Sequence, residues 1–184
     1  MINMGYFPMC IKLEGRKVAL VGNGSQIKDK EEKLNPFGAV MMHCTVAELC
    51  DTEPDEMPAM VVVGDTDTEE AEKAFRFCTE RNIPINVVDV PGLCTFFFPA
   101  LINRGTLTVS VSTGGSSPAA AAYLKRQIEA QIPDRTEEIL VWLEEKRSSL
   151  RSQGIMKEAV AEAFLQNRPL TEKECEALKE TIEG

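Results

Sequence analysis

The stretch KVALVGNGSQI, residues 17–27, is an apolar run that ends abruptly in two glycines spaced by one residue. It predicts a buried strand that turns tightly into a helix. In the dinucleotide-binding fingerprint the first glycine permits this turn, the second lets a pyrophosphate approach the backbone, and the helix N-terminus offers free N–H groups. Gly22 and Gly24 fit these roles, but Ile27 stands where a third glycine or an alanine is expected. Because glycine also serves ordinary strand-to-helix turns, the pair alone does not establish a cofactor site.

Length, composition and charge narrow the class of protein. With 184 residues and 43% hydrophobic residues, the chain can form one domain with an appendage or two small domains. It has no apolar run long enough to span a membrane and no leader pattern, so we expect a cytoplasmic protein without a membrane partner. A net charge of −9 argues against nucleic acid or an anionic membrane as the default partner.

The metal-binding and redox side chains are sparse. The six cysteines are scattered without a C-x-x-C pair, which is typical of reduced core residues in a chain without a leader. His43 is the only histidine, so one chain cannot build a multi-histidine metal site. Its place beside Cys44 in an apolar run indicates a core or edge position. We expect no dedicated metal site.

Apolar runs alternate with helical patterns along the first part of the chain. Strands are predicted at about 17–21, 38–44, 60–63, 83–88 and 107–111, with helices near 25–35 and 68–81. This spacing is typical of an α/β fold, a Rossmann-like parallel sheet with helices on both faces. Ligands bind such sheets beyond the carboxyl ends of the strands, so Gly22, Gly64, Asp89 and Ser112 are expected along one edge. We place a Rossmann-like domain at 1–112 and a helical region at 113–184.

A second glycine-rich junction lies at residues 108–118, TVSVSTGGSSP. It reads as a strand, then a turn of hydroxyls and glycines, then a helix with Ser117 as N-cap and Pro118 at the first helical position. Free N–H groups and hydroxyls at such a junction can receive a carboxylate or phosphate. A plain capped turn has the same local sequence.

Four stretches in a fixed order carry a family resemblance: LEGRKVALVGNG, INVVD, FFFPALINRG and SVSTGGSSPA. With them the chain resembles precorrin-2 dehydrogenase, the dehydrogenase/ferrochelatase part of siroheme synthases, from about Tyr6 to Pro133. The resemblance implies NAD-dependent oxidation of precorrin-2 to sirohydrochlorin in siroheme biosynthesis, sometimes with iron insertion by the same site. It also implies a homodimer.

The same resemblance assigns roles to residues. Asp89 is expected to be the essential acid/base carboxylate, although a strand-terminal Asp often only accepts hydrogen bonds in its own turn. Substrate contacts are expected from Ser112, Thr113, Gly114, Gly115 and Arg104. Cofactor contacts are expected from the residues that follow the first and third strands: Gly22, Asn23, Gly24, Ser25, Thr66 and Asp67.

Departures from the family pattern keep a second hypothesis open. Ile27 and Asp29 stand where an alanine and an arginine are expected, and charges replace the usual apolar stripe of the first helix. The alternative is therefore a non-catalytic regulatory module that binds a dinucleotide or a tetrapyrrole. The acid that often binds the cofactor ribose after the second strand is replaced by His43, Cys44 and Thr45, so the sequence does not distinguish NAD from NADP.

The chain is predicted to be helical from Thr136 onward. Thr171 to Glu174 is a capping-box candidate, with Leu170 and Cys175 placed as a hydrophobic staple. Because such short amphipathic helices form a thin core alone, we expect dimerisation through this tail and the helix 118–132. The apolar stripe expected on that helix is Ala121, Leu124, Ile128 and Ile132.

Overall fold

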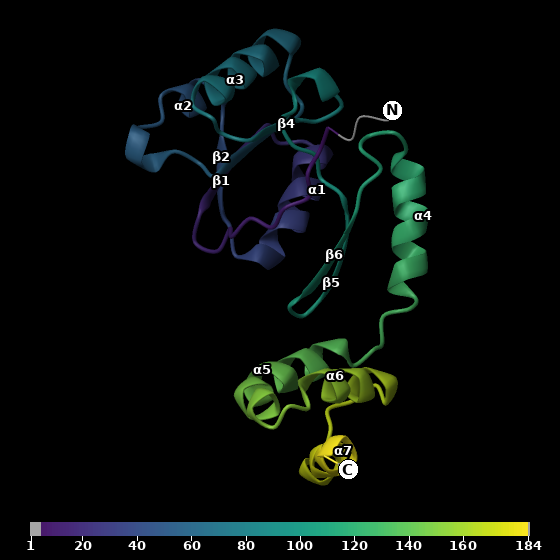
Figure 1. Ribbon diagram of the computed structural model, residues 1–184. Coiled ribbons are helices and arrows are strands. Elements are labelled where there is room, and N and C mark those ends of the chain that lie inside the picture. Colours follow the sequence, from purple (N-terminus) through teal and green to yellow (C-terminus); the bar gives the residue numbers. More distant parts are fainter. Residues whose placement is uncertain (1–4, 184) are drawn as a thin grey trace. The chain divides into compact units, whose positions relative to one another are not determined.

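A computed structural model describes residues 5–183 of the chain (Figure 1). The chain divides into two compact units, the first ending at Phe98 and the second beginning at Pro99. The first unit contains β1 (Lys17–Val21), α1 (Ser25–Leu34), η1 (Asn35–Phe37), β2 (Val40–Cys44), α2 (Val46–Cys50), η2 (Pro54–Glu56), β3 (Met60–Val63), α3 (Thr68–Glu80), β4 (Ile85–Val87) and η3 (Pro91–Leu93). The second contains β5 (Ala100–Arg104), β6 (Leu107–Val111), α4 (Pro118–Glu129), α5 (Thr136–Ser152), α6 (Met156–Leu165) and α7 (Glu172–Glu183).

The first unit is built on a four-stranded parallel sheet in the order β2-β1-β3-β4. Val21, the last residue of β1, lies in register with Cys44 of β2 and Val63 of β3, and Val63 pairs with Val87 of β4. The four strands therefore end at the same edge. This arrangement confirms the predicted parallel sheet.

Helices cover both faces of this sheet, as the sequence predicted. Side chains alternate between the two faces of a strand, and in β1 Ala19 and Val21 pack under α2 and α3, whereas Val18 and Leu20 pack under α1. Figure 1 shows α1 on the opposite side of the sheet from α2 and α3. β1 and β3 are buried along their apolar lengths because they lie in the middle of the sheet.

The prediction that 107–111 adds a fifth strand to the parallel sheet is wrong. β6 pairs antiparallel with β5 in a separate two-stranded sheet, where Leu107 lies opposite Arg104. Only two residues connect the strands, and a parallel pair needs a much longer crossover. Gly105 has φ +57° in this turn. The hairpin belongs to the second unit and packs with α4, so the unit boundary lies earlier than the one expected after Ser112.

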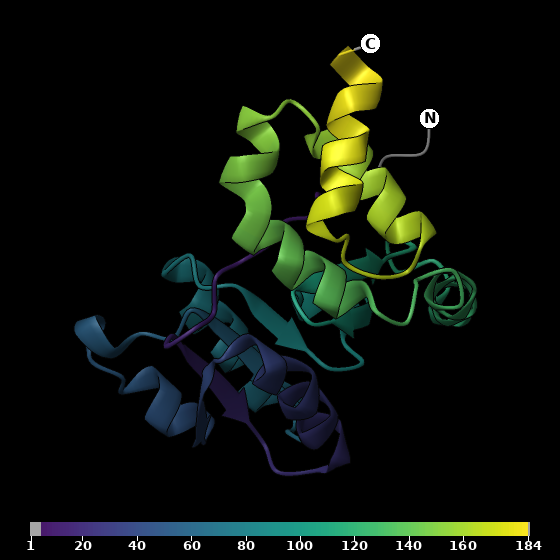
Figure 2. The same cartoon turned by 90° about the horizontal axis from the view of Figure 1, so that it is seen from below.

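The helices α5, α6 and α7 of the second unit form a small core, and Figure 2 shows them grouped together. The predicted capping box is present: the Thr171 N–H donates to Glu174 Oε2 at 2.8 Å, and the Glu174 N–H donates to Thr171 Oγ1 at 3.4 Å. Hydrogen bonds from Arg168 and then from Thr171 lower the pKa of the Glu174 carboxyl to about 2. Leu170 and Cys175 pack in this core, as expected for a hydrophobic staple.

Candidate functional site

Gly22, the first glycine of the turn, has no room for a side chain because the backbone of Gly64 lies against it. Gly22 has φ +106°, and a Cβ on it would lie 2.0 Å from the carbonyl oxygen of Gly64, which follows β3. The turn between β1 and α1 therefore has no room for a side chain at this position.

Ile27 is accommodated by a second glycine. Its side chain is 1% exposed and packs between the two glycines, with its atoms 3.4 Å from where a Cβ on Gly22 would lie and 3.2 Å from that on Gly64. Gly64 thus leaves the space that the fingerprint normally gains from a small residue at position 27. The first turn of α1 therefore packs against the sheet although Ile27 replaces the expected glycine or alanine.

Gly24 is the N-cap of α1 and supplies no side-chain cap. The first-turn N–H groups of such a helix have no partner within it, and no acidic side chain lies in this turn. The Gly24 N–H itself donates to Asp65 Oδ2 at 3.1 Å, and a Cβ on Gly24 would lie 2.2 Å from that oxygen. Asp65 has φ +56°. The Asp65 carboxylate, from the β3–α3 loop, therefore occupies the space where a side chain on Gly24 would lie.

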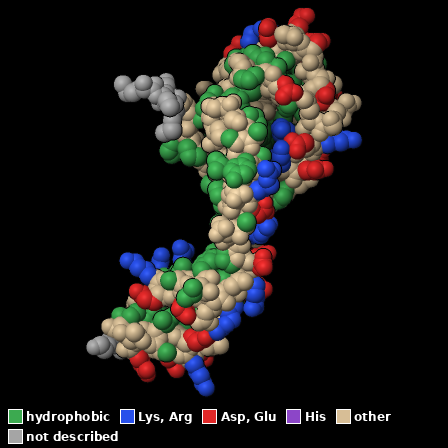
Figure 3. Space-filling view, turned by 90° about the vertical axis from the view of Figure 1, so that its right-hand side faces the viewer, with side chains coloured by type: hydrophobic (Ala, Val, Ile, Leu, Met, Phe, Trp, Pro, Cys, Tyr) green, Lys and Arg blue, Asp and Glu red, His purple; other side chains and the backbone are tan. Residues whose placement is uncertain are grey.

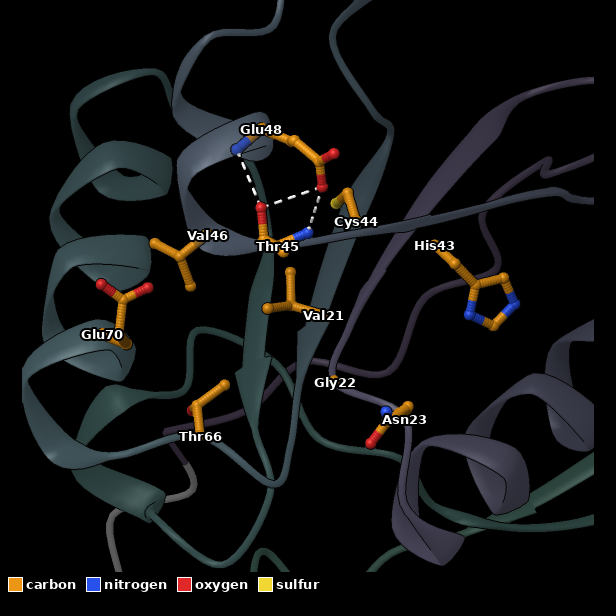
Figure 4. Close-up of a pocket in the computed structure, with 10 residues that line it drawn as sticks. All are labelled: Val21, Gly22, Asn23, His43, Cys44, Thr45, Val46, Glu48, Thr66 and Glu70. Atoms are coloured by element: carbon orange, nitrogen blue, oxygen red, sulfur yellow. Dashed lines mark hydrogen bonds between the residues drawn. The ribbon is translucent and has the colours of Figure 1, made fainter.

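A cavity of about 490 Å³ opens at the carboxyl ends of β1 and β2 (Figure 4). Three of the predicted cofactor residues, Gly22, Asn23 and Thr66, line it. Gly24, Ser25 and Asp67 are not in its wall, and Asp67 instead caps α3 by accepting from the Glu70 N–H at 2.9 Å. The remaining wall residues are Val21, His43, Cys44, Thr45, Val46, Glu48 and Glu70.

The β2–α2 turn forms the wall that the predicted cofactor set missed. Thr45 and Glu48 make a capping box in which the Thr45 N–H donates to Glu48 Oε2 at 2.8 Å and the Glu48 N–H donates to Thr45 Oγ1 at 3.2 Å (Figure 4). The bond from the Thr45 N–H, and then a bond that the Thr45 hydroxyl donates to Glu48 Oε2 at 2.9 Å, lower the pKa of the Glu48 carboxyl. The signal in the sequence is the T-x-x-E pattern directly after an apolar run.

The charged groups of this wall are carboxylates. Glu48 and Glu70 line the cavity, and none of the described residues in its wall is Lys or Arg. Burial, and then the Glu48 carboxylate, raise the pKa of the Cys44 thiol. His43 lies on the edge strand β2 with its side chain exposed and its Nε2 3.3 Å from Glu31 Oε1.

Asp89 lies in the loop that follows β4, and two hydrogen bonds join the residues that begin this loop to those that end it. The Thr95 N–H donates to the Ile85 carbonyl at 2.8 Å, and the buried Asn86 amide donates to the Phe96 carbonyl at 3.0 Å. Asp89 has φ +62°, and its Oδ2 accepts from Gln26 Nε2 at 2.6 Å. The first turn of α1 and the Asp89 carboxylate are therefore in direct contact.

The predicted substrate residues lie in the second unit. In the β6–α4 turn the Gly114 N–H donates to Ser112 Oγ at 3.2 Å, and the Ser117 N–H donates to Thr113 Oγ1 at 3.1 Å. Ser117 caps α4, as predicted. Gly115 has φ +85°. Arg104, on β5, pairs with Glu129 of α4 at 2.9 Å.

Within residues 5–183 no group of three or more His, Cys, Asp or Glu side chains has the arrangement of a metal site. No helix in the same range has the length and apolar character needed to cross a membrane.

Two family models match the chain. One, described as "Putative NAD(P)-binding", covers residues 9–100, and one described as "Sirohaem biosynthesis protein central" covers residues 104–131. The first match includes the glycine turn, the cavity and Asp89, and the second includes Arg104 and the Ser112–Gly115 turn.

Individual relatives agree with these matches. A siroheme synthase of Methylobacillus flagellatus is 35% identical over 148 residues, which are 71% of this chain and 32% of the relative. One of Pseudomonas aeruginosa is 28% identical over 198 residues, covering 90% of this chain and 42% of the relative. The solved structure of SirC, a precorrin-2 dehydrogenase, matches with a TM-score of 0.63 at 18% identity and covers 97% of this chain and 99% of that one. The chain thus spans about a third of the siroheme synthases it matches and shares the SirC fold.

Proposed function

Because the chain belongs to the precorrin-2 dehydrogenase and siroheme synthase N-terminal family, we propose that it oxidises precorrin-2 to sirohydrochlorin with NAD. The observation that carries the proposal is the contact between the glycine turn and Asp89: Gln26, two residues after Gly24, holds the Asp89 carboxylate at 2.6 Å. A dinucleotide turn and a candidate proton acceptor are thereby joined within one unit.

The first unit fits an adenine dinucleotide. Its cavity of about 490 Å³ lies in the size range of small-molecule sites, and the uncapped N-terminus of α1 suits a pyrophosphate. Gly22, Asn23, Gly24 and Ser25 would hold the cofactor at the turn, with Thr66 and Asp67 in the loop after β3. When bound, NAD supplies the hydride acceptor.

The Asp65 carboxylate is the group that the pyrophosphate must displace from the Gly24 N–H. Asp65→Asn removes its charge, and Asn tolerates the left-handed backbone found at this position. We expect the Kd for NAD to fall roughly tenfold, the scale of one charge-assisted hydrogen bond. Calorimetric titration measures this change, with the exposed Asp55→Asn as the matched control. An unchanged Kd means that Asp65 and the pyrophosphate do not share a position.

The Glu48 carboxylate favours NAD over NADP. A 2′-phosphate needs a cation, and this wall presents the carboxylates of Glu48 and Glu70. Glu48→Gln keeps the capping box, which Gln also completes, and removes one charge. We expect the affinity ratio of NADP to NAD to rise roughly fivefold or more. Glu69→Gln, on the same helix as Glu70 but outside the cavity wall, should leave this ratio unchanged. An equal rise in Glu69→Gln would mean that Glu48 does not determine the preference for NAD.

The remaining roles concern the proton and the substrate. Asp89 accepts the proton that leaves the macrocycle as the hydride is removed. The Ser112–Gly115 turn and Arg104 contact the substrate, a polycarboxylate that must be bound by a chain with net charge −9. On the face that Figure 3 shows, acidic and basic side chains are mixed, so local cations rather than the overall field attract the substrate. We assign this attraction to Arg104, Lys125 and Arg126.

One observation favours a second candidate function, a non-catalytic module that binds a tetrapyrrole or a dinucleotide. The Gly24 N–H already donates a hydrogen bond to the Asp65 carboxylate, so the pyrophosphate of a dinucleotide must compete with this carboxylate. Calorimetry with NAD and with precorrin-2, followed by analysis of the tetrapyrrole formed when both are present, separates the two functions. The enzyme forms sirohydrochlorin only with NAD, and the module binds without forming it.

We also propose that the protein is a homodimer with α4 in the interface. Leu124 and Ile128, four residues apart on α4, are exposed, whereas Ala121 of the predicted stripe is buried within the second unit. Leu124→Glu combined with Ile128→Glu should therefore convert the dimer to a monomer. Light scattering measures the mass, with Val40→Glu in the first unit as the control for an added charge at an exposed apolar position. An unmutated protein that is monomeric at micromolar concentration refutes the dimer.

A further inference from the structure

We propose that Gln26 is a positioning residue for Asp89 in the oxidation, an inference that rests on the proposed function. Its side-chain amide donates to Asp89 Oδ2 at 2.6 Å across 63 positions of sequence. Nothing in the glycine fingerprint demands a glutamine at this position, because the fingerprint leaves it open.

Both partners of this contact are held by their surroundings. Gln26 lies in the first turn of α1 beside Ile27, whose buried side chain is wedged against Gly22 and Gly64. Asp89 lies in the loop that Thr95 and Asn86 fasten to the rest of the unit. The amide therefore joins two fixed backbones and selects one orientation of the carboxylate.

The chemistry of the donor matters as much as its position. In the part of the chain that the structure describes, Gln26 is the only group that donates a hydrogen bond to the Asp89 carboxylate. The lysines of α1 with a partner, Lys30 and Lys33, bind Asp29 at 2.9 and 2.7 Å. A cation on a carboxylate weakens it as a base, whereas a neutral amide orients it and leaves its charge available. Oδ2 is thus fixed, and Oδ1 remains for the substrate proton.

A double-mutant cycle tests the proposal. Gln26→Met keeps the length of the side chain and removes the donor, so kcat should fall roughly tenfold or more, because small misplacements of a reacting group are costly. The KM and Kd for NAD should stay unchanged, because the α1 backbone still forms the pyrophosphate site. In the Asp89→Asn background the same substitution should lower kcat no further, since Gln26 acts through Asp89. Lys28→Met, exposed on the same helix, is the matched control.

Two results overturn the proposal. One is an unchanged kcat in Gln26→Met, and the other is an equal loss in the Asp89→Asn background, which indicates a role independent of Asp89. Restoration of kcat by Gln26→His, a shorter donor, would add support.

The contact is also measured without turnover. In the NMR spectrum of the uniformly labelled protein, the Gln26 side-chain amide resonances should shift when Asp89 is replaced by Asn and should not shift in Asp51→Asn. If this shift is seen but the unmutated protein does not oxidise precorrin-2, the proposed function fails while the contact stands. If the unmutated protein oxidises precorrin-2 and this shift is absent, the positioning role fails alone.

Discussion

Asp89→Asn is expected to lower kcat for precorrin-2 oxidation by on the order of 10²-fold or more, the usual scale for losing a general base. The substitution removes the proton acceptor and changes little else. Asn is among the residues that adopt a left-handed backbone most readily, so the φ of +62° at this position is retained. The loop remains fastened by Asn86 and Thr95. Binding of NAD and of the tetrapyrrole should therefore stay near normal.

Steady-state kinetics combined with calorimetry measure these effects. Asp51→Asn is the matched control, because this exposed carboxylate of the same unit lies at the end of α2 and is not among the residues that line the cavity. A variant of Asp89 that oxidises precorrin-2 at the unmutated rate would give Asp89 a structural role in its turn and leave the proton acceptor unassigned.

Gly24→Val should abolish NAD binding while the first unit stays folded. A Cβ at Gly24 lies within 2.6 Å of both carboxylate oxygens of Asp65, so the valine covers the face that the pyrophosphate must approach. The fold survives because the contacted atoms belong to an exposed side chain at a loop, which can turn away. Calorimetry should detect no heat of NAD binding, and circular dichroism should be unchanged.

Two other glycines serve as comparisons for this variant. Among residues 5–183, no atom lies within 4 Å of a Cβ on Gly92, so Gly92→Val should bind NAD normally. Gly22→Val should instead destabilise the unit, because its Cβ would lie 2.0 Å from a backbone oxygen. Equal NAD affinity in the Gly24→Val and unmutated proteins would mean that NAD does not bind at the Gly24 turn.

Periodicity and turn residues predicted the parallel sheet because its strands are short, buried apolar runs separated by helical patterns. The same approach assigned 107–111 to that sheet. An apolar run alone does not indicate which strand it pairs with. The feature that decides the pairing is the two-residue connection at Gly105, which is long enough only for antiparallel strands.

The site was predictable only where its residues are local. The glycine turn and Asp89 stand directly after strands, so their shared edge follows from the topology of a parallel sheet. The contacts of Asp65 with Gly24 and of Gln26 with Asp89 join residues 41 and 63 positions apart, and no sequence pattern encodes them. Glu48 lies between these cases, because its capping box is visible in the sequence but its place in the cavity wall is not.

The absorbance of reduced nicotinamide, followed after the purified chain is mixed with NAD and precorrin-2 without oxygen, tests the proposed oxidation most directly. We predict that this absorbance rises in step with the loss of precorrin-2, and that the rise depends on the chain and is strongly slowed by Asp89→Asn. The contrary result is an absorbance that rises no faster than in the enzyme-free mixture although calorimetry shows that both ligands bind. It would contradict the proposed oxidation and favour the non-catalytic binding module.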